Sequence, residues 1–278
     1  PLIYDAHGTL VEEMIASDFI RRGSISAAFW SWLERAIQSR ADYVIAQSEM
    51  RKQALINDGV DADKITVIPD APVWPSRMMK KADDLLDRYN LQSKKVIIYS
   101  GSLNYYQGIE ILLKSLKKVC EKWNDVVLII FGNSNASYYR KLAEQMGIAK
   151  NIVFVHDVPY DELPRFLSIS NIAVAPRLYG KNVPGKILDY LASGVAIIGS
   201  DTEGILSIIT NNENGLIFKS GDADDLHRKL DFLLMSPDVA SRLGSSAKKL
   251  AESRFSWERN VDCIMKLYFQ LAGFPIEF

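Results

Sequence analysis

Short, continuously apolar runs alternate with helical patterns through most of this chain. From the middle of the chain onward, these runs are rich in Val and Ile and fall at 96–101, 126–132, 151–158, 171–176, 195–200 and 215–219. Continuous apolar runs are typical of strands that are covered on both faces of a parallel sheet. The segments between them repeat apolar residues at a spacing near 3.6, as helices do. Residues 73–256 are therefore predicted to form a doubly wound α/β domain with right-handed crossovers.

The first 70 residues show the same alternation in a shorter form. Strand patterns at 2–5, 42–48 and 64–69 are accompanied by helical patterns at 24–39 and 48–57. Three strands are few for a doubly wound domain, so we expect residues 1–72 to be the later portion of a domain whose N-terminal fragment is missing. Three prolines between 68 and 76 indicate a stiff boundary segment. At the far end, 255–273 reads as one long amphipathic helix.

Composition narrows the class of protein. The chain has 278 residues, 48% hydrophobic and 24% charged, with a formal net charge of -1. These values are typical of a globular protein and argue against a dedicated nucleic-acid binder. Cys120 and Cys263 lack metal or redox spacing and are expected to be reduced thiols in a cytosolic protein.

Two observations bear on membranes. No apolar run reaches the length needed to span a bilayer. The aromatic and basic segment 19–36 could contact a bilayer as an amphipathic surface, but a buried helix pair is the favoured interpretation.

In open parallel sheets, ligands bind at the carboxyl ends of the strands. The loop at 99–110 contains Gly101 and Gly108 and precedes a helix, so it is either a phosphate-binding loop or an ordinary turn. After the strand at 195–200, Glu203 and Gly204 open a helix, where a glutamate is also simply good capping. His7 is the one histidine at the end of an N-terminal strand pattern.

The segment 176–194 gathers three cations, Arg177, Lys181 and Lys186, around the start of a helix. Positive charge is mildly unfavourable there because the backbone N–H groups already make this end electropositive. Lys186 and Asp189 share one helical face, so they form either a surface ion pair or a ligand site. In the second case the cations would bind an anion and Asp189 would accept hydrogen bonds from sugar hydroxyls.

Several stretches together resemble one family. They are "YDAHG", "ADYVIAQSEMRKQAL", "KITVIPDAP", "YSGSL", "VPGKILDYLASGVAIIGSDTEGILSII" and "NENGLIF", and they cover nearly the whole chain. This chain resembles the retaining glycosyltransferases of the GT-B fold, family 4, the "glycosyl transferases group 1". The resemblance implies two facing Rossmann-like domains, here with the N-terminal, acceptor-side domain incomplete, and a closing helix at 257–278 that crosses back to it.

The resemblance also implies an activity. Such an enzyme moves a sugar, with retention of configuration, from a nucleotide-sugar to a glycan or lipid-linked acceptor. The donor is most often a UDP-sugar, no tightly bound metal or other cofactor is needed, and the usual role is cell-surface polysaccharide biosynthesis. A cytoplasmic location, at the inner face of the membrane, would fit such acceptors. We expect that a chain with an incomplete N-terminal domain could bind donor and yet transfer little.

Site residues follow from the same resemblance. Asp189 matches a glutamate that binds ribose hydroxyls, Lys181 falls where a glutamate contacts the donor sugar, and His7 matches a histidine that approaches that sugar. The catalytic expectations are therefore His7 and Lys181. The expected donor-binding residues are Gly101, Ser102, Gln107, Gly108, Arg177, Pro184, Lys186, Ile187, Asp189, Glu203 and Gly204.

This chain departs from the family pattern at two positions. Ser102 and Gln107 are neutral where the family usually carries an arginine and a lysine that bind the diphosphate. We hypothesise that Arg177, Lys181 and Lys186 supply that charge from the neighbouring loop. A non-catalytic relative that binds a nucleotide-sugar or a protein partner is the alternative. A nucleotide-sugar epimerase of the same fold fits the "PGKILDYLASG" pattern less well.

Overall fold

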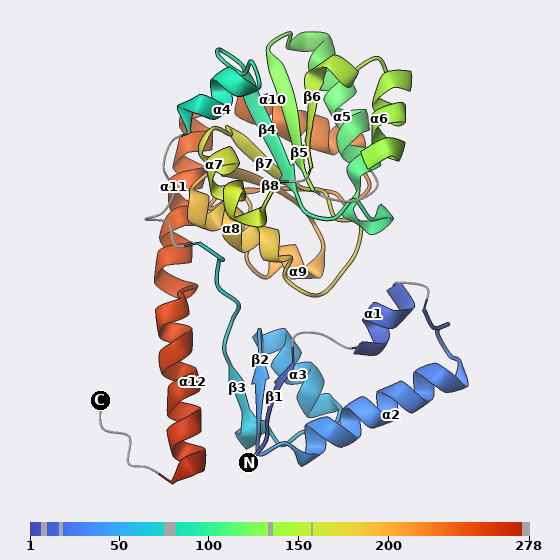
Figure 1. Ribbon diagram of the computed structural model, residues 1–278, viewed down its shortest axis with the longest axis vertical. Coiled ribbons are helices and arrows are strands. Elements are labelled where there is room, and N and C mark those ends of the chain that lie inside the picture. The colour runs from blue at the N-terminus through green and yellow to red at the C-terminus, as the bar shows by residue number, and fades with distance from the viewer. Residues whose placement is uncertain (7–9, 17–18, 75–81, 133–135, 157, 274–278) are drawn as a thin grey trace. The chain divides into compact units, whose positions relative to one another are not determined.

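The computed structural model describes all residues except 7–9, 17–18, 75–81, 133–135, 157 and 274–278. Within it the chain divides into two compact units, each shown in Figure 1. The first unit combines Pro1–Ala71 with Trp257–Phe278, and the second is Pro72–Ser256.

The first unit is built on a short parallel sheet in the order β1-β2-β3. Its strands are β1 (Ile3–Ala6), β2 (Tyr43–Ala46) and β3 (Ile65–Val67). Its helices are α1 (Leu10–Ala16), α2 (Ile25–Arg40), α3 (Glu49–Asn57) and α12 (Trp257–Ala272). Serine caps explain two of the helix starts: Ser24 Oγ accepts from the N–H of Ala27, and Ser48 Oγ from that of Arg51.

Both faces of this small sheet are covered. One face packs Val44 and Ala46 against Leu55 of α3. On the other, Ile45 packs against Leu267 of α12, although the two residues are far apart in the sequence. The Asn260 side chain adds a hydrogen bond to the carbonyl of Pro69, at 2.7 Å. The closing helix is thus an integral part of the first unit.

The second unit contains a six-stranded parallel sheet in the order β6-β5-β4-β7-β8-β9. Its strands are β4 (Lys95–Ser100), β5 (Val126–Phe131), β6 (Ile152–Val155), β7 (Ile172–Ala175), β8 (Ala196–Ser200) and β9 (Leu216–Phe218). Its helices are α4 (Asp83–Arg88), α5 (Ile109–Lys122), α6 (Ala136–Gln145), α7 (Leu163–Ser168), α8 (Gly185–Ser193), α9 (Glu203–Leu206), α10 (Ala223–Met235) and α11 (Pro237–Arg254). The predicted doubly wound α/β fold is confirmed, with helices on both faces of the sheet (Figure 1).

The strand order reverses between β4 and β7. From β4 the chain adds β5 and β6 on one side, then returns to pair β7 with β4 on the other. The loops that leave β4 and β7 therefore lie side by side at the carboxyl edge of the sheet, where doubly wound folds bind their ligands. Two apolar layers, one on each face of the sheet, hold these strands in place.

Candidate functional site

The loops after β4 and β7 are locked together by backbone contacts. The N–H of Leu178 donates to the carbonyl of Tyr106 at 2.8 Å. Gly108, with a φ of 73°, lies so close that an added Cβ would meet the carbonyl oxygen of Pro176 at 1.9 Å. Only glycine fits both that backbone conformation and that space. The site is therefore positioned by the packing of two loops that lie about 70 residues apart.

Lys186, the second residue of α8, reaches across to the loop after β4. Its Nζ donates to Gln107 Oε1 at 3.0 Å and lies 3.9 Å from the ring centre of Tyr99. An added Cβ on Gly101 would lie 2.8 Å from Nζ, so the glycine leaves room for the ammonium group. The interpretation of Lys186 as half of a surface ion pair with Asp189 is thus wrong.

The surroundings of Lys186 disfavour the charged form of its side chain. Burial holds the pKa of its ammonium group well below the ordinary lysine value, and the positive charge of Arg177 lowers it further. The hydrogen-bond acceptor of Nζ, Gln107, is neutral and buried. An anion beside Nζ would offset the cost of burying this charge.

Arg177 is the second cation that the structure turns inward. Its guanidinium group donates to the carbonyl of Asn182 at 3.1 Å and lies 5.4 Å from the ring centre of Tyr106. It also packs onto Gly180, where an added Cβ would come within 2.5 Å of Nη2. Its Nε–H is buried without a hydrogen-bond partner among the described residues. Burial lowers the pKa of Arg177, so this group too is a charge partly removed from water.

The start of α9 closes the third side of the site. The N–H of Gly204 donates to the carbonyl of Gly180 at 3.3 Å, and an added Cβ on Gly204 would meet the carbonyl of Asn182 at 2.1 Å. Thr202 Oγ1, just before the helix, is buried without a hydrogen-bond partner in the described part of the chain. Lys181 and Glu203 are exposed. The glycine has a packing role, whereas the lysine and glutamate remain accessible.

Asp189 is placed differently from the sequence-based expectation. Its side chain is only 1% exposed; Oδ1 accepts from the N–H of Val73 at 3.1 Å and Oδ2 accepts from the hydroxyl of Tyr160. Burial raises the pKa of its carboxyl to about 6, although these hydrogen bonds oppose the shift. Both oxygens are therefore occupied, and a ribose hydroxyl would have to replace one of these donors.

Other expected donor-binding residues take supporting positions. Ile187 is fully buried in the core, so its side chain supports the helix and does not reach the site. Pro184 is buried just before the first residue of α8. Ser102 is exposed, and its carbonyl accepts from the hydroxyl of Tyr99. The expectation for His7 falls outside the described residues.

Sequence patterns did not single out the aromatic residues of the site. Tyr190 Oη, fully buried on α8, accepts from the N–H of Ser100 at 2.8 Å and so ties the helix to the end of β4. Trp74 and Tyr160 form a ring pair with centroids 4.9 Å apart beside Asp189. The tyrosine in "LDYLASG" was visible as part of a motif, but no local spacing links Tyr160 to Asp189.

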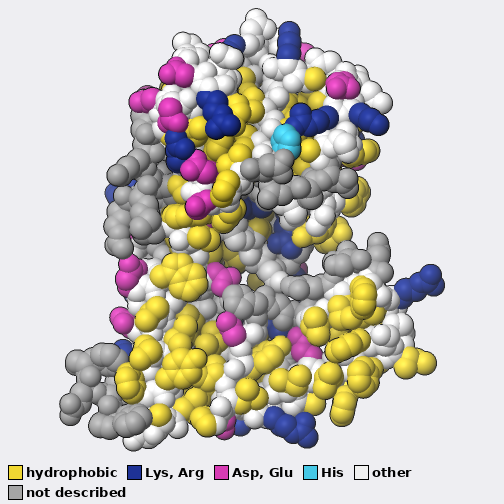
Figure 2. Space-filling model, in the orientation of Figure 1, with side chains coloured by type: hydrophobic (Ala, Val, Ile, Leu, Met, Phe, Trp, Pro, Cys, Tyr) yellow, Lys and Arg dark blue, Asp and Glu magenta, His cyan; other side chains and the backbone are white. Residues whose placement is uncertain are grey.

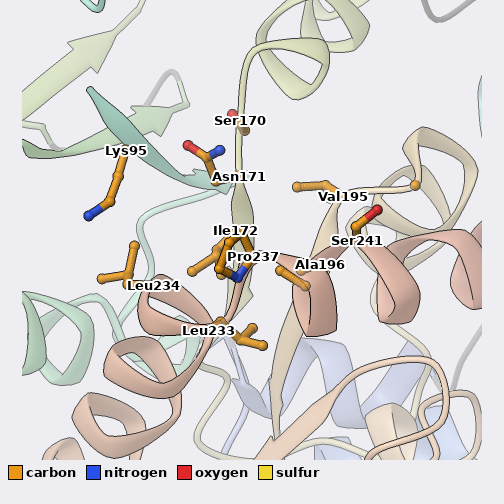
Figure 3. A pocket seen from close by; sticks show the side chains of 12 residues that line it. Lys95, Ser170, Asn171, Ile172, Val195, Ala196, Leu233, Leu234, Pro237 and Ser241 are labelled. Atoms are coloured by element: carbon orange, nitrogen blue, oxygen red, sulfur yellow. The ribbon is translucent and has the colours of Figure 1, made fainter. Parts of the chain in front are cut away.

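A second pocket in the described structure has fewer charged side chains than the site above. Figure 3 shows a pocket of about 290 Å3 near Lys95, Ile172 and Ala196, which begin β4, β7 and β8. It therefore lies at the amino ends of these strands, opposite the site above.

The described residues contain no group of His, Cys, Asp or Glu side chains suited to hold a metal ion. None of the described helices is long and apolar enough to cross a membrane. Cys120, on α5, and Cys263, on α12, are both free cysteines.

Comparisons with known proteins agree with this geometry. A family model described as "Glycosyl transferases group 1" matches residues 83–250, more than half of the 278-residue chain. A second, "Glycosyl transferase 4-like domain", matches residues 1–71.

Two curated relatives and one solved structure illustrate the likeness. The chain is 24% identical over 205 residues to Spore coat protein SA of Bacillus subtilis (strain 168), covering 71% of this chain and 54% of that protein. It is 24% identical over 250 residues to the GDP-mannose-dependent alpha-(1-6)-phosphatidylinositol monomannoside mannosyltransferase of Mycolicibacterium smegmatis, covering 87% and 62%. The chain thus spans little more than half the length of these relatives.

The structure of Anabaena Alr3699/HepE in complex with UDP-glucose superimposes with a TM-score of 0.81 at 16% identity, covering 97% of this chain and 72% of that one. This likeness shows that the fold is GT-B, as predicted from the sequence. On the evidence of the family match, the chain belongs to the glycosyl transferases group 1 family.

Proposed function

We propose that this chain is the donor-binding part of a retaining glycosyltransferase, of the hexosyltransferase type. The enzyme transfers a sugar from a nucleotide-sugar, with UDP as the favoured nucleotide, to a glycan or lipid-linked acceptor. Its role is in cell-surface polysaccharide biosynthesis, in the cytoplasm and at the inner face of the membrane. The named relatives support this proposal, since one is a mannosyltransferase and another was crystallised with UDP-glucose.

The observation that carries the proposal is the position of Lys186. The family's usual cations are absent from the loop after β4, where Ser102 and Gln107 are neutral. Lys186 brings an ammonium group into that same loop from α8, where its contacts with Gln107 and the ring of Tyr99 provide no negatively charged partner. A diphosphate at this edge of the sheet would restore the pKa of the lysine and accept its hydrogen bond.

The surrounding groups suit a leaving nucleoside diphosphate. Arg177 lies close enough to lower the pKa of Lys186 by its charge, so both cations act on the same region. The N-terminus of α5, a helix of 14 residues that starts after Gly108, adds backbone N–H groups at the end of the loop. As the bond between sugar and diphosphate breaks, these fixed charges stabilise the negative charge that develops.

The remaining roles are assigned by position. Asp189 would receive ribose hydroxyls once the hydroxyl of Tyr160 is displaced from Oδ2. The ring pair of Trp74 and Tyr160 beside that carboxylate offers an aromatic surface for the nucleobase. Lys181 and His7 are proposed to contact the donor sugar, the lysine from an exposed position in the loop after β7.

Two observations favour a second candidate function, a relative that binds a nucleotide-sugar without transferring it. Lys181 replaces the carboxylate expected beside the donor sugar, and the carboxylate oxygens of Asp189 are already hydrogen-bonded within the protein. Such a protein would use the same cations for binding but would lack groups that act on the sugar.

Calorimetry with UDP, UDP-glucose, GDP-mannose and an ADP-sugar tests donor binding. We expect a UDP compound to bind, and Arg177→Gln together with Lys186→Met to abolish that binding. If this double substitution leaves donor affinity unchanged, the proposed diphosphate site is wrong. Donor hydrolysis by the full-length protein separates the two candidates, because the binding-only relative would leave the bond between sugar and diphosphate intact.

A further inference from the structure

Among the described residues of the second unit, the exposed tyrosines share one position in the fold. Tyr105, Tyr138 and Tyr179 are 72%, 51% and 55% exposed, and each lies in the segment that follows a strand: β4, β5 and β7 respectively. The fourth, Tyr160, follows β6 and belongs to the ring pair beside Asp189. Parallel strands end at one edge of their sheet, and β5, β4 and β7 are neighbours in it. Tyr138, Tyr105 and Tyr179 therefore form a row at the carboxyl edge, the tyrosine row.

Contacts with neighbouring residues hold the tyrosine row in place. The ring of Tyr179 pairs with that of Tyr106, with centroids 5.9 Å apart, and the backbone hydrogen bond from Leu178 to Tyr106 joins their loops. The hydroxyl of Tyr138 donates to Oε1 of Glu110, in the first turn of α5, at 2.7 Å. Rings that are already positioned lose little conformational entropy when they bind a ligand.

The tyrosine row adjoins the proposed donor site on its sugar side. Asp189 and Lys186 are three residues apart on α8, about 4.5 Å along its axis. A nucleotide with its ribose at Asp189 and its diphosphate at Lys186 therefore points toward the start of α8. The loop before that start carries Tyr179 and also Arg177, whose guanidinium carbon lies 5.4 Å from the centre of the Tyr106 ring. The tyrosine row thus begins beyond the diphosphate, where the sugar of a bound donor would lie.

The loop after β4 offers neutral polar groups beside these rings. Residues 99–109 contain no charged side chain, and Ser102 and Asn104 are exposed. Tyrosine rings pack against the C–H groups on the face of a pyranose ring, while hydroxyl and amide groups hydrogen-bond the hydroxyls of the sugar. A polyanion would need a surface of positive charge, but acidic and basic side chains are mixed on the side of the second unit that Figure 2 shows. The tyrosine row therefore suits an uncharged carbohydrate.

We infer that the tyrosine row stacks against the sugar rings of an uncharged acceptor glycan, with Tyr179 nearest to the donor. Neighbouring parallel strands lie about 4.8 Å apart, so three of them span about 10 Å, which is longer than one pyranose ring. The acceptor is therefore a chain of sugars, and not a single sugar or a lipid alone. This inference rests on the proposed function and narrows its acceptor to a glycan.

The experiment is a titration followed by saturation-transfer NMR in the presence of UDP. The probes are neutral hexasaccharides of glucose, mannose and galactose, together with the three monosaccharides. At least one hexasaccharide should bind more tightly than its monosaccharide. Tyr105→Ser with Tyr179→Ser should weaken that binding about tenfold or more, because two stacked rings are lost. Tyr105→Phe with Tyr179→Phe should retain it, since both rings are kept.

Tyr268→Ser provides the matched control. Tyr268 lies on α12 of the first unit and is 55% exposed, the same fraction as Tyr179. Its loss should leave glycan binding unchanged. The inference is overturned if no hexasaccharide binds, if the serine pair at 105 and 179 binds glycan like the unaltered protein, or if Tyr268→Ser weakens binding as much as that pair.

Two further measurements separate this surface from the donor site and from another occupant. UDP calorimetry on the serine pair should match the unaltered protein. A protein that binds UDP but no hexasaccharide refutes the glycan surface and leaves the proposed function standing, whereas one that binds a hexasaccharide through the tyrosine row but no UDP refutes the donor site alone. A dimer that dissociates when the serine pair is introduced would mean that a second copy covers the row, and that result refutes the inference.

Discussion

Replacing Lys186 by methionine isolates the charge that the donor site depends on. Methionine keeps an unbranched apolar side chain against Tyr99 but removes the ammonium group that Gln107 accepts from. A charge-assisted hydrogen bond to phosphate contributes about 1.5–3 kcal/mol, so UDP should bind about tenfold to about 150-fold more weakly. The free protein should be as stable as before or more so, because burial disfavours the charged lysine in the absence of an anion.

Calorimetry of UDP binding as a function of pH gives a second readout. The pKa of Lys186 is depressed in the free protein, and a bound diphosphate should raise it, so binding takes up a proton wherever the free lysine is partly neutral. Once the phosphates of UDP are fully ionised, affinity should therefore fall as pH rises through the depressed pKa. Lys186→Met should show no such fall.

Lys117→Met is the matched control for this prediction. Lys117 is exposed on α5, the helix that follows the same loop, and its loss should leave UDP affinity unchanged. The reasoning fails if Lys186→Met binds UDP as tightly as the unaltered protein, or if its pH dependence is the same. It also fails if Lys186→Met unfolds at a clearly lower temperature, because the lysine would then be a stabilising structural group.

Three further predictions test the supporting contacts. Burial raises the pKa of Asp189 to about 6, so ionising it costs stability, and the free energy of unfolding should fall by about 2–3 kcal/mol between pH ~4 and pH ~6. Asp189→Asn should remove that fall in urea titrations, and an unchanged slope would exclude this carboxyl as its source. Gly108→Ala should lower the unfolding temperature more than Gly147→Ala, because the two glycines have φ of 73° and 74° but only the first would place its Cβ against Pro176; equal effects would contradict the close contact. Tyr160→Phe should leave UDP affinity equal or higher, since it removes the hydroxyl that competes with ribose at Asp189; weaker binding would show that the hydroxyl itself contacts the nucleotide.

The strands of the second unit could be predicted because each is covered on both faces. β5 is buried along its whole length, and its six residues are all apolar in the sequence. Some apolar runs in the sequence are longer than the strands they predict. The run at 151–158 continues past β6, which ends at Val155. An apolar run indicates that residues are buried, not that they form a strand. Loop residues that pack on the core are apolar as well.

The charged residues of the site could also be predicted, but the directions in which their side chains point could not. Helical spacing placed Lys186 and Asp189 on one face, yet the lysine reaches Gln107 while the aspartate binds Val73 and Tyr160. These partners come from loops brought together by the strand order, which local spacing does not contain. The orientation of α2 could not be decided from the sequence for a similar reason, since Glu34 accepts from the N–H of Leu10 on α1 and lies 3.9 Å from Arg51 on α3.

The two charged residues of α8 are both held by neutral partners. Lys186 donates to an amide, and Asp189 accepts from a backbone N–H and a hydroxyl, so neither loses its charge to an ion pair within the described structure. Because the two charges belong to one helix but turn to different loops, they stay separated and do not neutralise each other. A carboxylate at position 107 would pair with Lys186 and remove the advantage of bringing it there. The neutral residue that looked like a loss in the loop after β4 is therefore what leaves the relocated cation available to an anion.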